Sequence, residues 1–112
     1  LLDLGSVPLL KARTHLPVVV DPSHGLGRAD LIPPMMAAAA AAGADGLLVE
    51  VHPTPAQSVS DAAQALSLEE FQRAVRPLAP ILEAVGRRLV TAARGFSTPL
   101  GSPDDTSTHP RR

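Results

Sequence analysis

The sequence contains no cysteine, no tryptophan and no tyrosine. Without cysteine the chain cannot form a disulfide or a thiolate metal site from its own residues, so the redox compartment stays undetermined. Apolar residues make up 45% of the chain but aromatic residues only 2%. Any core must therefore be built from Ala, Leu and Val rather than from large rings.

An excess of charge of one sign is also missing. The net charge is −1 and the ten Lys and Arg residues are scattered, which argues against binding to nucleic acid or to an anionic membrane surface. The longest apolar stretch, residues 35–42, is far shorter than the ~20 residues that span a bilayer. We therefore expect small-molecule or protein partners. Because the chain opens with Leu1 inside an apolar, helix-like segment, we also expect it to be a fragment.

Two short apolar runs have the pattern of buried parallel strands. Residues 17–21, PVVVD, are rich in β-branched side chains, and residues 46–51, GLLVEV, are apolar except for one glutamate. Between them a loop, SHGLGR, leads to Asp30, which is the predicted N-cap of a helix over residues 31–42 with Gly43 as its stop.

Two further helices are predicted, one before the first strand and one after the second strand in the sequence. One covers residues 4–13, with Ser6 as a possible N-cap. The other begins at a capping-box pattern, Ser67 and Glu70, and its apolar residues recur every three or four positions as far as residue 85. Pro77 and Pro80 interrupt that pattern and predict a kink or a restart.

The order helix, strand, helix, strand, helix indicates an α/β fold built on one βαβα unit. Two strands cannot close a barrel, and a (β/α)₈ barrel needs about 250 residues, so the remaining sheet must come from elsewhere. We assign residues 1–90 to this unit. Residues 91–112 lack any apolar period and are predicted to be a disordered tail.

Glu50 is the most informative residue. Burying an ionised carboxylate inside a strand costs on the order of several kcal/mol unless a cation lies nearby. His24 follows the first predicted strand and Asp61 follows the second, so all three belong to the carboxyl edge of a parallel sheet, where α/β proteins place their active sites. One His and two carboxylates suit Mn²⁺, Fe²⁺, Co²⁺ or Zn²⁺.

Simpler interpretations compete with this metal site. Taken singly, His24 and Asp61 are more often structural than metal-binding, and an Arg or Lys from missing strands could neutralise Glu50. His52 shares the predicted strand face of Glu50, so on spacing it competes with His24 as a ligand, although it precedes a proline and could merely order the loop. Residues 25–28, GLGR, could hold a phosphate on backbone N–H groups. A short Gly-containing turn is a weak signal, however, and an Arg in the position of Arg28 is more often a solvated loop cation than a phosphate ligand.

Three segments of the sequence resemble a known enzyme family: HLPVVVDPSHGLGRADLIPP, AAGADGLLVEVHPTP and SVSDAAQALSLEEF. They are similar to the C-terminal motifs of DAHP synthases (3-deoxy-7-phosphoheptulonate synthases) of the type related to KDO 8-phosphate synthase and to the chorismate mutase fusions. The match covers about residues 2–88. It implies the C-terminal βαβα portion of a TIM (β/α)₈ barrel.

The resemblance implies that His24, Glu50 and Asp61 bind a divalent metal ion. It therefore favours His24 rather than His52 as the histidine ligand. The intact enzyme would condense phosphoenolpyruvate with erythrose 4-phosphate in the first step of the shikimate pathway, as a cytoplasmic homo-oligomer, and Arg28 is a candidate substrate contact. The family's fourth metal ligand, a cysteine, and its main phosphate-binding residues are not in this sequence. We therefore expect the chain alone to be inactive.

The sequence also departs from the family pattern. Ala62 and Ala63 replace the usual Gly-Pro after the metal-binding Asp, and Ala29 replaces a second basic residue. The alternatives are a KDO 8-phosphate synthase-like enzyme and a non-catalytic half-barrel piece. Against the former, relatives of that kind have an insertion after the metal-region His and usually Thr where Val51 stands.

Overall fold

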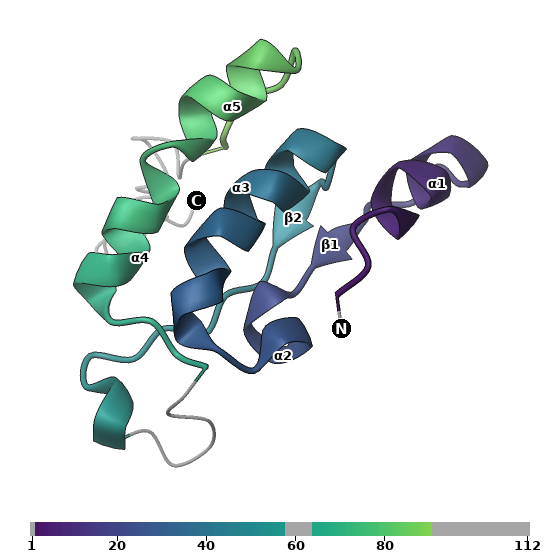
Figure 1. Cartoon of the computed structure of the whole chain (residues 1–112). Helices are drawn as coiled ribbons and strands as arrows, with labels where there is room; N and C mark the ends of the chain where they lie inside the picture. The colour runs from purple at the N-terminus through teal and green to yellow at the C-terminus, as the bar shows by residue number, and fades with distance from the viewer. Residues whose placement is uncertain (1, 58–63, 91–112) are drawn as a thin grey trace, which may run out of the picture.

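The computed structural model describes residues 2–57 and 64–90 (Figure 1). Two parallel strands, β1 (Val19–Val20) and β2 (Gly46–Leu47), form a small sheet in which Val19 pairs with Gly46. The predicted α/β class and the parallel pairing are confirmed. Asp61 and the predicted tail over residues 91–112 lie outside the described residues.

The helices lie mainly on one face of the sheet (Figure 1). They are α1 (Ser6–Arg13), α2 (Pro22–Leu26), α3 (Ile32–Ala42), α4 (Leu68–Val75) and α5 (Leu78–Ala84), with 3₁₀ turns η1 (Ala29–Leu31) and η2 (Pro55–Gln57). In Figure 1, α3 lies over the strands, with α1 on one flank and α4 and α5 on the other. In the described part of the chain, no helix is long and apolar enough to cross a membrane.

The regular strands are shorter than the predicted ranges of 17–21 and 46–51. Pairing nevertheless continues beyond them, because Leu48 N donates to Val20 O at 2.9 Å. Farther on, Val51 forms a parallel bridge with Leu66, just before α4. The second apolar run therefore has different backbone partners at its two ends, which breaks the regular ladder between them.

The prediction of a loop over SHGLGR is wrong for its first four residues, which belong to α2. Asp21 caps α2 by accepting a hydrogen bond from His24 N at 3.0 Å, and Pro22 occupies the first turn, where its missing N–H costs nothing. Gly27 ends the helix in the left-handed conformation, at φ 67°. The helix turns the chain back within a few residues of the end of β1.

Two predicted N-caps are also wrong. Leu31, not Asp30, precedes α3, and the side chain of Asp30 binds Arg28 instead. Gly5, not Ser6, precedes α1, and Ser6 Oγ donates to Asp3 O at 2.6 Å. In both cases a nearby side-chain or backbone group competes for the capping residue. The predicted stop of α3 is confirmed, since Gly43 adopts φ 101°.

The capping box before α4 is confirmed. Ser67 Oγ accepts from Glu70 N at 3.2 Å, and Glu70 Oε2 accepts from Ser67 N at 2.8 Å. The predicted restart is confirmed as well, because Pro77 stands at the N-cap of a separate helix, α5. Proline removes the hydrogen bond that would have continued α4.

Helix α3 organises the core from its centre. On one side its buried residues pack against α4, α5 and Leu66, which precedes the N-cap of α4. This cluster contains Ile32, Met36, Ala40, Leu66, Ala74, Leu78 and Leu82. On its other side Ala39 packs with Val7 of α1 and Val20 of β1. The core is aliphatic, as the composition predicts, and it fixes the two strand ends relative to each other.

Candidate functional site

The two strands place His24 and Glu50 side by side. β1 runs directly into α2, which carries His24, and the extended chain after β2 carries Glu50. His24 Nε2 lies 3.5 Å from Glu50 Oε2. The prediction that both residues reach the same carboxyl edge of the sheet is confirmed.

Glu50 belongs to the sheet face that points away from the helices. Leu47 and Val49 pack against the helical core, whereas Leu48 is 56% exposed. Because successive side chains of an extended chain alternate between faces, Glu50 shares the face of Leu48. In a closed barrel this face would be the interior.

Asp21 holds His24 through two contacts. Its Oδ1 accepts from His24 N at 3.0 Å, and its Oδ2 lies 2.7 Å from His24 Nδ1. Partial burial alone would raise the pKa of Asp21, but the hydrogen bonds and charge of His24 outweigh it and lower that pKa below its usual value. With Nδ1 donating to this carboxylate, Nε2 is the ring nitrogen that presents a lone pair toward Glu50.

Ser23 connects the two strand ends. Its side chain is completely buried, and its Oγ accepts a hydrogen bond from Glu50 N at 2.8 Å. The backbone carbonyl of Glu50 accepts from Leu66 N at 3.0 Å. The peptide groups on both sides of the Glu50 α-carbon are therefore held in place, and the position of its side chain is restricted.

The third predicted ligand, Asp61, lies outside the described residues. Within the described residues, no group of three His, Asp or Glu side chains is arranged to hold a metal ion. The structure therefore brings together two of the three predicted ligands, and the metal-binding role of the set stays a prediction.

His52 has a structural partner. Its Nδ1 accepts from Thr54 N at 2.9 Å, and its backbone N donates to Leu66 O at 2.9 Å. These contacts match the interpretation in which His52 orders the turn after the second strand.

Arg28, the candidate substrate contact, forms a two-pronged ion pair with Asp30. Its Nε and Nη2 donate to the two carboxylate oxygens at 3.0 and 2.6 Å. Its side chain is 65% exposed. A phosphate would have to compete with Asp30 for this guanidinium. Gly25 and Leu26 belong to α2, so the GLGR segment is not an open loop, and substrate binding by Arg28 stays a prediction.

Sequence reasoning missed Asp21 and Ser23 as contributors to the site. The apolar run places Asp21 at the end of a predicted strand, although an Asp directly before a proline is a recognised helix-start signal. Ser23 carried no signal in the sequence, because its role depends on contact with a residue 27 positions away.

Comparison with known proteins decides the family. The model of the DAHP synthetase I family matches residues 1–84. This chain belongs to that family. The resemblance recognised in its motifs is thereby confirmed.

Individual relatives agree with this assignment. The chain is 45% identical over 85 residues to a phospho-2-dehydro-3-deoxyheptonate aldolase from Thermotoga maritima, covering 76% of this chain and 25% of that protein. It is 30% identical over 93 residues to a 2-dehydro-3-deoxyphosphooctonate aldolase from Desulfosudis oleivorans, and this match covers 73% of this chain and 33% of that protein. This member of the DAHP synthetase I family thus spans a quarter to a third of those relatives.

A solved structure supports the fold. The truncated form of 3-deoxy-D-arabino-heptulosonate 7-phosphate synthase from Thermotoga maritima superimposes with a TM-score of 0.77 at 43% identity. The match covers 80% of this chain and 34% of that one. The arrangement of strands and helices in this family member is therefore shared with a solved DAHP synthase.

Proposed function

We propose that this chain forms the metal-binding C-terminal part of a (β/α)₈-barrel DAHP synthase, which condenses phosphoenolpyruvate with erythrose 4-phosphate. The supporting observation is the approach of His24 and Glu50 at the carboxyl ends of two parallel strands. Family membership and the name of the Thermotoga maritima relative support the reaction. The remaining barrel strands would complete the site, and the chain alone would not turn over substrate.

The exposed sheet face supports a larger barrel. Val19 of β1 is 61% exposed, and Leu48, directly after β2, is 56% exposed. Large aliphatic side chains of this kind normally fill the interior of a (β/α)₈ barrel. Additional strands beside β1 and β2 would bury them.

The donor atoms fit a divalent ion. Two ligand atoms, each about 2.1 Å from a shared ion at a tetrahedral angle, lie about 3.4 Å apart. His24 Nε2 and Glu50 Oε2 are 3.5 Å apart. Asp61 is the proposed third ligand, and an imidazole with two carboxylates suits Mn²⁺, Fe²⁺, Co²⁺ or Zn²⁺.

The protein's own residues would prepare the site before substrate binds. Asp21 orients the imidazole of His24, and Ser23 fixes the backbone of Glu50. A bound divalent ion would supply Lewis-acid polarisation of the aldehyde oxygen of the sugar phosphate. Cationic side chains on other strands would neutralise the substrate phosphates.

The second candidate is the octonate-forming reaction, because the 30%-identical relative carries that name. The two products differ by one carbon, so the aldehyde partner would have five carbons instead of four. The higher identity to the heptonate enzyme supports the four-carbon substrate. So does the direct passage from His24 through α2 to Gly27, without an insertion.

A chimera tests this proposal. Residues 1–84 of this chain would replace the matching segment of the Thermotoga maritima relative, and phosphate release from phosphoenolpyruvate would be measured with four- and five-carbon sugar phosphates. We expect release with erythrose 4-phosphate, and its loss in a His24→Ala chimera of unchanged thermal stability. A folded chimera that is inactive with both sugars would instead support a non-catalytic piece.

A further inference from the structure

The edge of β2 that faces away from β1 is open. Leu48 N donates to Val20 O at 2.9 Å, which places the hydrogen-bonding groups of Leu48 on the β1 side. Because these groups alternate between the two edges along an extended chain, the N–H and C=O groups of Leu47 and Val49 point to the other edge. In the described part of the chain the sheet has two strands, so no strand pairs with this edge there.

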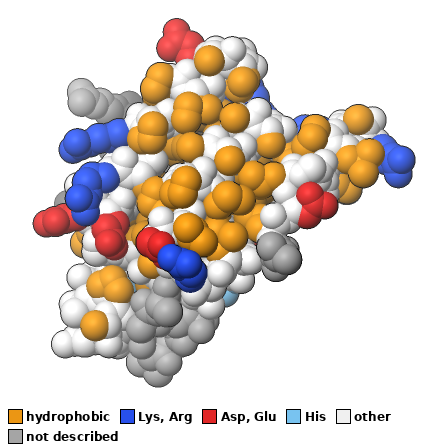
Figure 2. All heavy atoms as spheres, viewed as in Figure 1, with side chains coloured by type: hydrophobic (Ala, Val, Ile, Leu, Met, Phe, Trp, Pro, Cys, Tyr) orange, Lys and Arg blue, Asp and Glu red, His pale blue; other side chains and the backbone are white. Residues whose placement is uncertain are grey.

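An apolar groove runs along this open edge. Its volume is about 280 Å³, and its lining combines Leu47, Leu48 and Val49 with apolar residues of α4 and α5. Leu89, from the segment after α5, lines the same groove. Its side chain is 37% exposed, whereas the next residue, Val90, is 87% exposed. Hydrophobic side chains also gather over the face where α3 lies (Figure 2), but the groove at β2 already has a segment of this chain against it.

A single arginine anchors that segment. After α5 the chain turns at Gly86, which adopts φ 77°, and runs back behind the helix (Figure 1). The guanidinium of Arg87 donates to Gly43 O at 2.9 Å and to Ala44 O at 3.3 Å. It also donates to Asp45 Oδ1 at 2.7 Å. These acceptors lie at the C-terminal end of α3, where a basic side chain satisfies free carbonyl groups and is favoured by the helix dipole.

We propose that residues 87–90, the edge strap, cover the open edge of β2 and prevent another strand from pairing there. A new strand would lie about 4.8 Å from β2, in the space that Leu89 borders. The edge strap and an incoming strand therefore exclude each other. Covering an edge with a loop is one way in which proteins avoid edge-to-edge aggregation. The match of the family model ends at residue 84, before this segment.

The edge strap gives the sheet edge two states. With Arg87 bound to the end of α3, Leu89 lines the groove and the edge is closed. With Arg87 released, the edge is free to pair. In the proposed barrel a further strand would need the second state; this consequence rests on the proposed function, whereas the contact itself does not.

Because the chain lacks cysteine, a single introduced thiol reports whether the edge strap is closed. Leu89→Cys would be labelled with a maleimide, with and without Arg87→Ala. We expect Arg87→Ala to raise the labelling rate at least about threefold, because an exposed ion pair holds a segment against only modest opening. Val90→Cys, at an already exposed position, should label equally fast in both backgrounds.

A matched variant controls for a general loss of stability. Lys11→Ala removes the other basic side chain that binds Asp45 but leaves Arg87 in place, so it should not speed the labelling of Leu89→Cys. An unchanged labelling rate in Arg87→Ala, or an equal increase in Lys11→Ala, would overturn the proposal.

Thioflavin T fluorescence tests whether the freed edge pairs with other chains. We expect Arg87→Ala to aggregate faster than the parent chain and faster than Lys11→Ala. Adding Val49→Pro removes an N–H group that faces away from β1, so it should cancel this increase. Equal aggregation of Arg87→Ala and Lys11→Ala, or no effect of Val49→Pro, would contradict the role of the edge strap. Both measurements are independent of metal and substrate, so failure of the proposed function would leave their results unchanged.

Discussion

At the residue scale, the imidazole of His24 lies between two carboxylates. Asp21 contacts Nδ1 at 2.7 Å, and Glu50 lies 3.5 Å from Nε2. A carboxylate behind a histidine is the usual support of a metal ligand, because it fixes the ring orientation and raises the basicity of the other nitrogen. The sequence predicted the meeting of His24 and Glu50, since parallel strands end at one edge. It did not predict Asp21, whose role depends on the helix that it caps.

Asp21→Asn tests this support. The variant keeps the side-chain shape but removes the charge beside Nδ1, so we expect the affinity for Mn²⁺ to fall by about 10–100-fold. Calorimetric titration of the chain measures the effect. Asp30→Asn, which alters only the surface pair with Arg28, is the control and should leave the affinity unchanged. Equal affinity in the two variants would show that Asp21 does not support a metal ligand.

Ser23→Ala tests the link between the two strand ends. The change leaves Glu50 N without its hydrogen bond in a partly buried position, which costs about 1–3 kcal/mol. We expect a fall of this size in the free energy of unfolding from urea titration. Ser6→Ala, which removes an exposed hydrogen bond, should change it far less. An unaltered stability for Ser23→Ala would mean that another group holds Glu50.

At the element scale, the starts of helices show which local signals can be read from sequence. The capping box of α4 is predictable because Ser67 and Glu70 satisfy each other within one turn. Ser6 and Asp30 are not N-caps because each has a competing neighbour, Asp3 and Arg28 respectively. The regular strands are shorter than their apolar runs predict, since apolar character does not reveal where a backbone partner ends.

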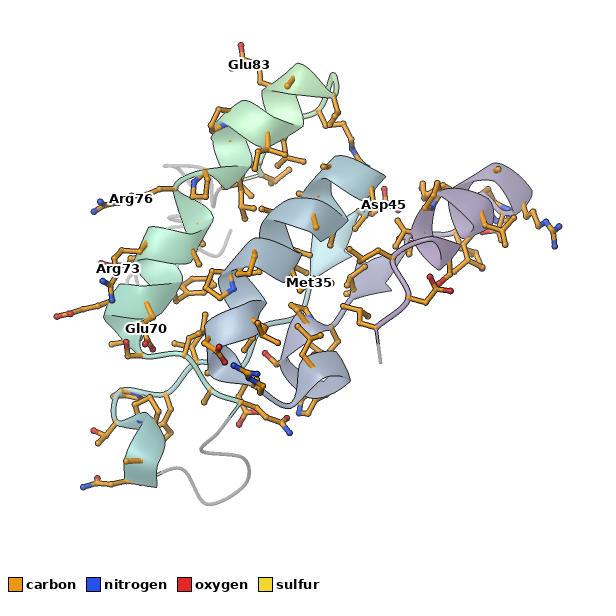
Figure 3. The ribbon with its side chains drawn as sticks, in the orientation of Figure 1. Met35, Asp45, Glu70, Arg73, Arg76 and Glu83 are labelled. Atoms are coloured by element: carbon orange, nitrogen blue, oxygen red, sulfur yellow. The ribbon has the colours of Figure 1, made fainter. Side chains whose placement is uncertain are left out.

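Asp45, between α3 and β2, ties several elements together (Figure 3). Its Oδ2 accepts from Lys11 Nζ and from Val18 N, both at 2.8 Å, and its Oδ1 accepts from Arg87 Nη2 at 2.7 Å. These hydrogen bonds hold the pKa of Asp45 well below its ordinary value of 3.8, and the bond from Lys11 has the largest effect. The ionised carboxylate thus links α1, the start of β1 and the segment after α5.

This network predicts an acid-sensitive fold. A carboxyl group whose pKa is lowered by folding contributes stability at pH values above its unfolded pKa, and the contribution disappears as the pH falls through the folded value. We expect the melting temperature to drop as the pH is lowered below about 4, and Asp45→Asn to flatten that drop. Glu83→Gln, on the exposed surface of α5, should keep the parental profile. An identical profile for all three proteins would contradict the role of Asp45.

At the scale of the whole molecule, the sequence predicted the α/β order and the family, because periodicity and motifs are local. It could not predict which face of α3 is left uncovered, since that depends on the positions of α1, α4 and α5. The sheet carries helices on one face, while Val19 and Leu48 are exposed on the other. In the proposed barrel, further strands would cover these exposed side chains.

The proposed barrel predicts that this chain is inactive on its own. Because further strands would supply the remaining groups of the site, we expect purified chain with Mn²⁺ to release no phosphate from phosphoenolpyruvate and erythrose 4-phosphate above the rate without protein. A malachite-green assay measures this. The Thermotoga maritima relative serves as the positive control. Turnover by the 112-residue chain would contradict the need for additional strands.

The proposed function requires that His24 and Glu50 bind the same divalent ion. An Mn²⁺ titration followed by electron paramagnetic resonance would compare the parent chain, His24→Ala, Glu50→Gln and the control His15→Ala, which alters an exposed residue. We expect one ion per chain in the parent and in the control, and an affinity at least about tenfold lower in each of the two site variants. Equal binding by all four proteins would contradict the claim.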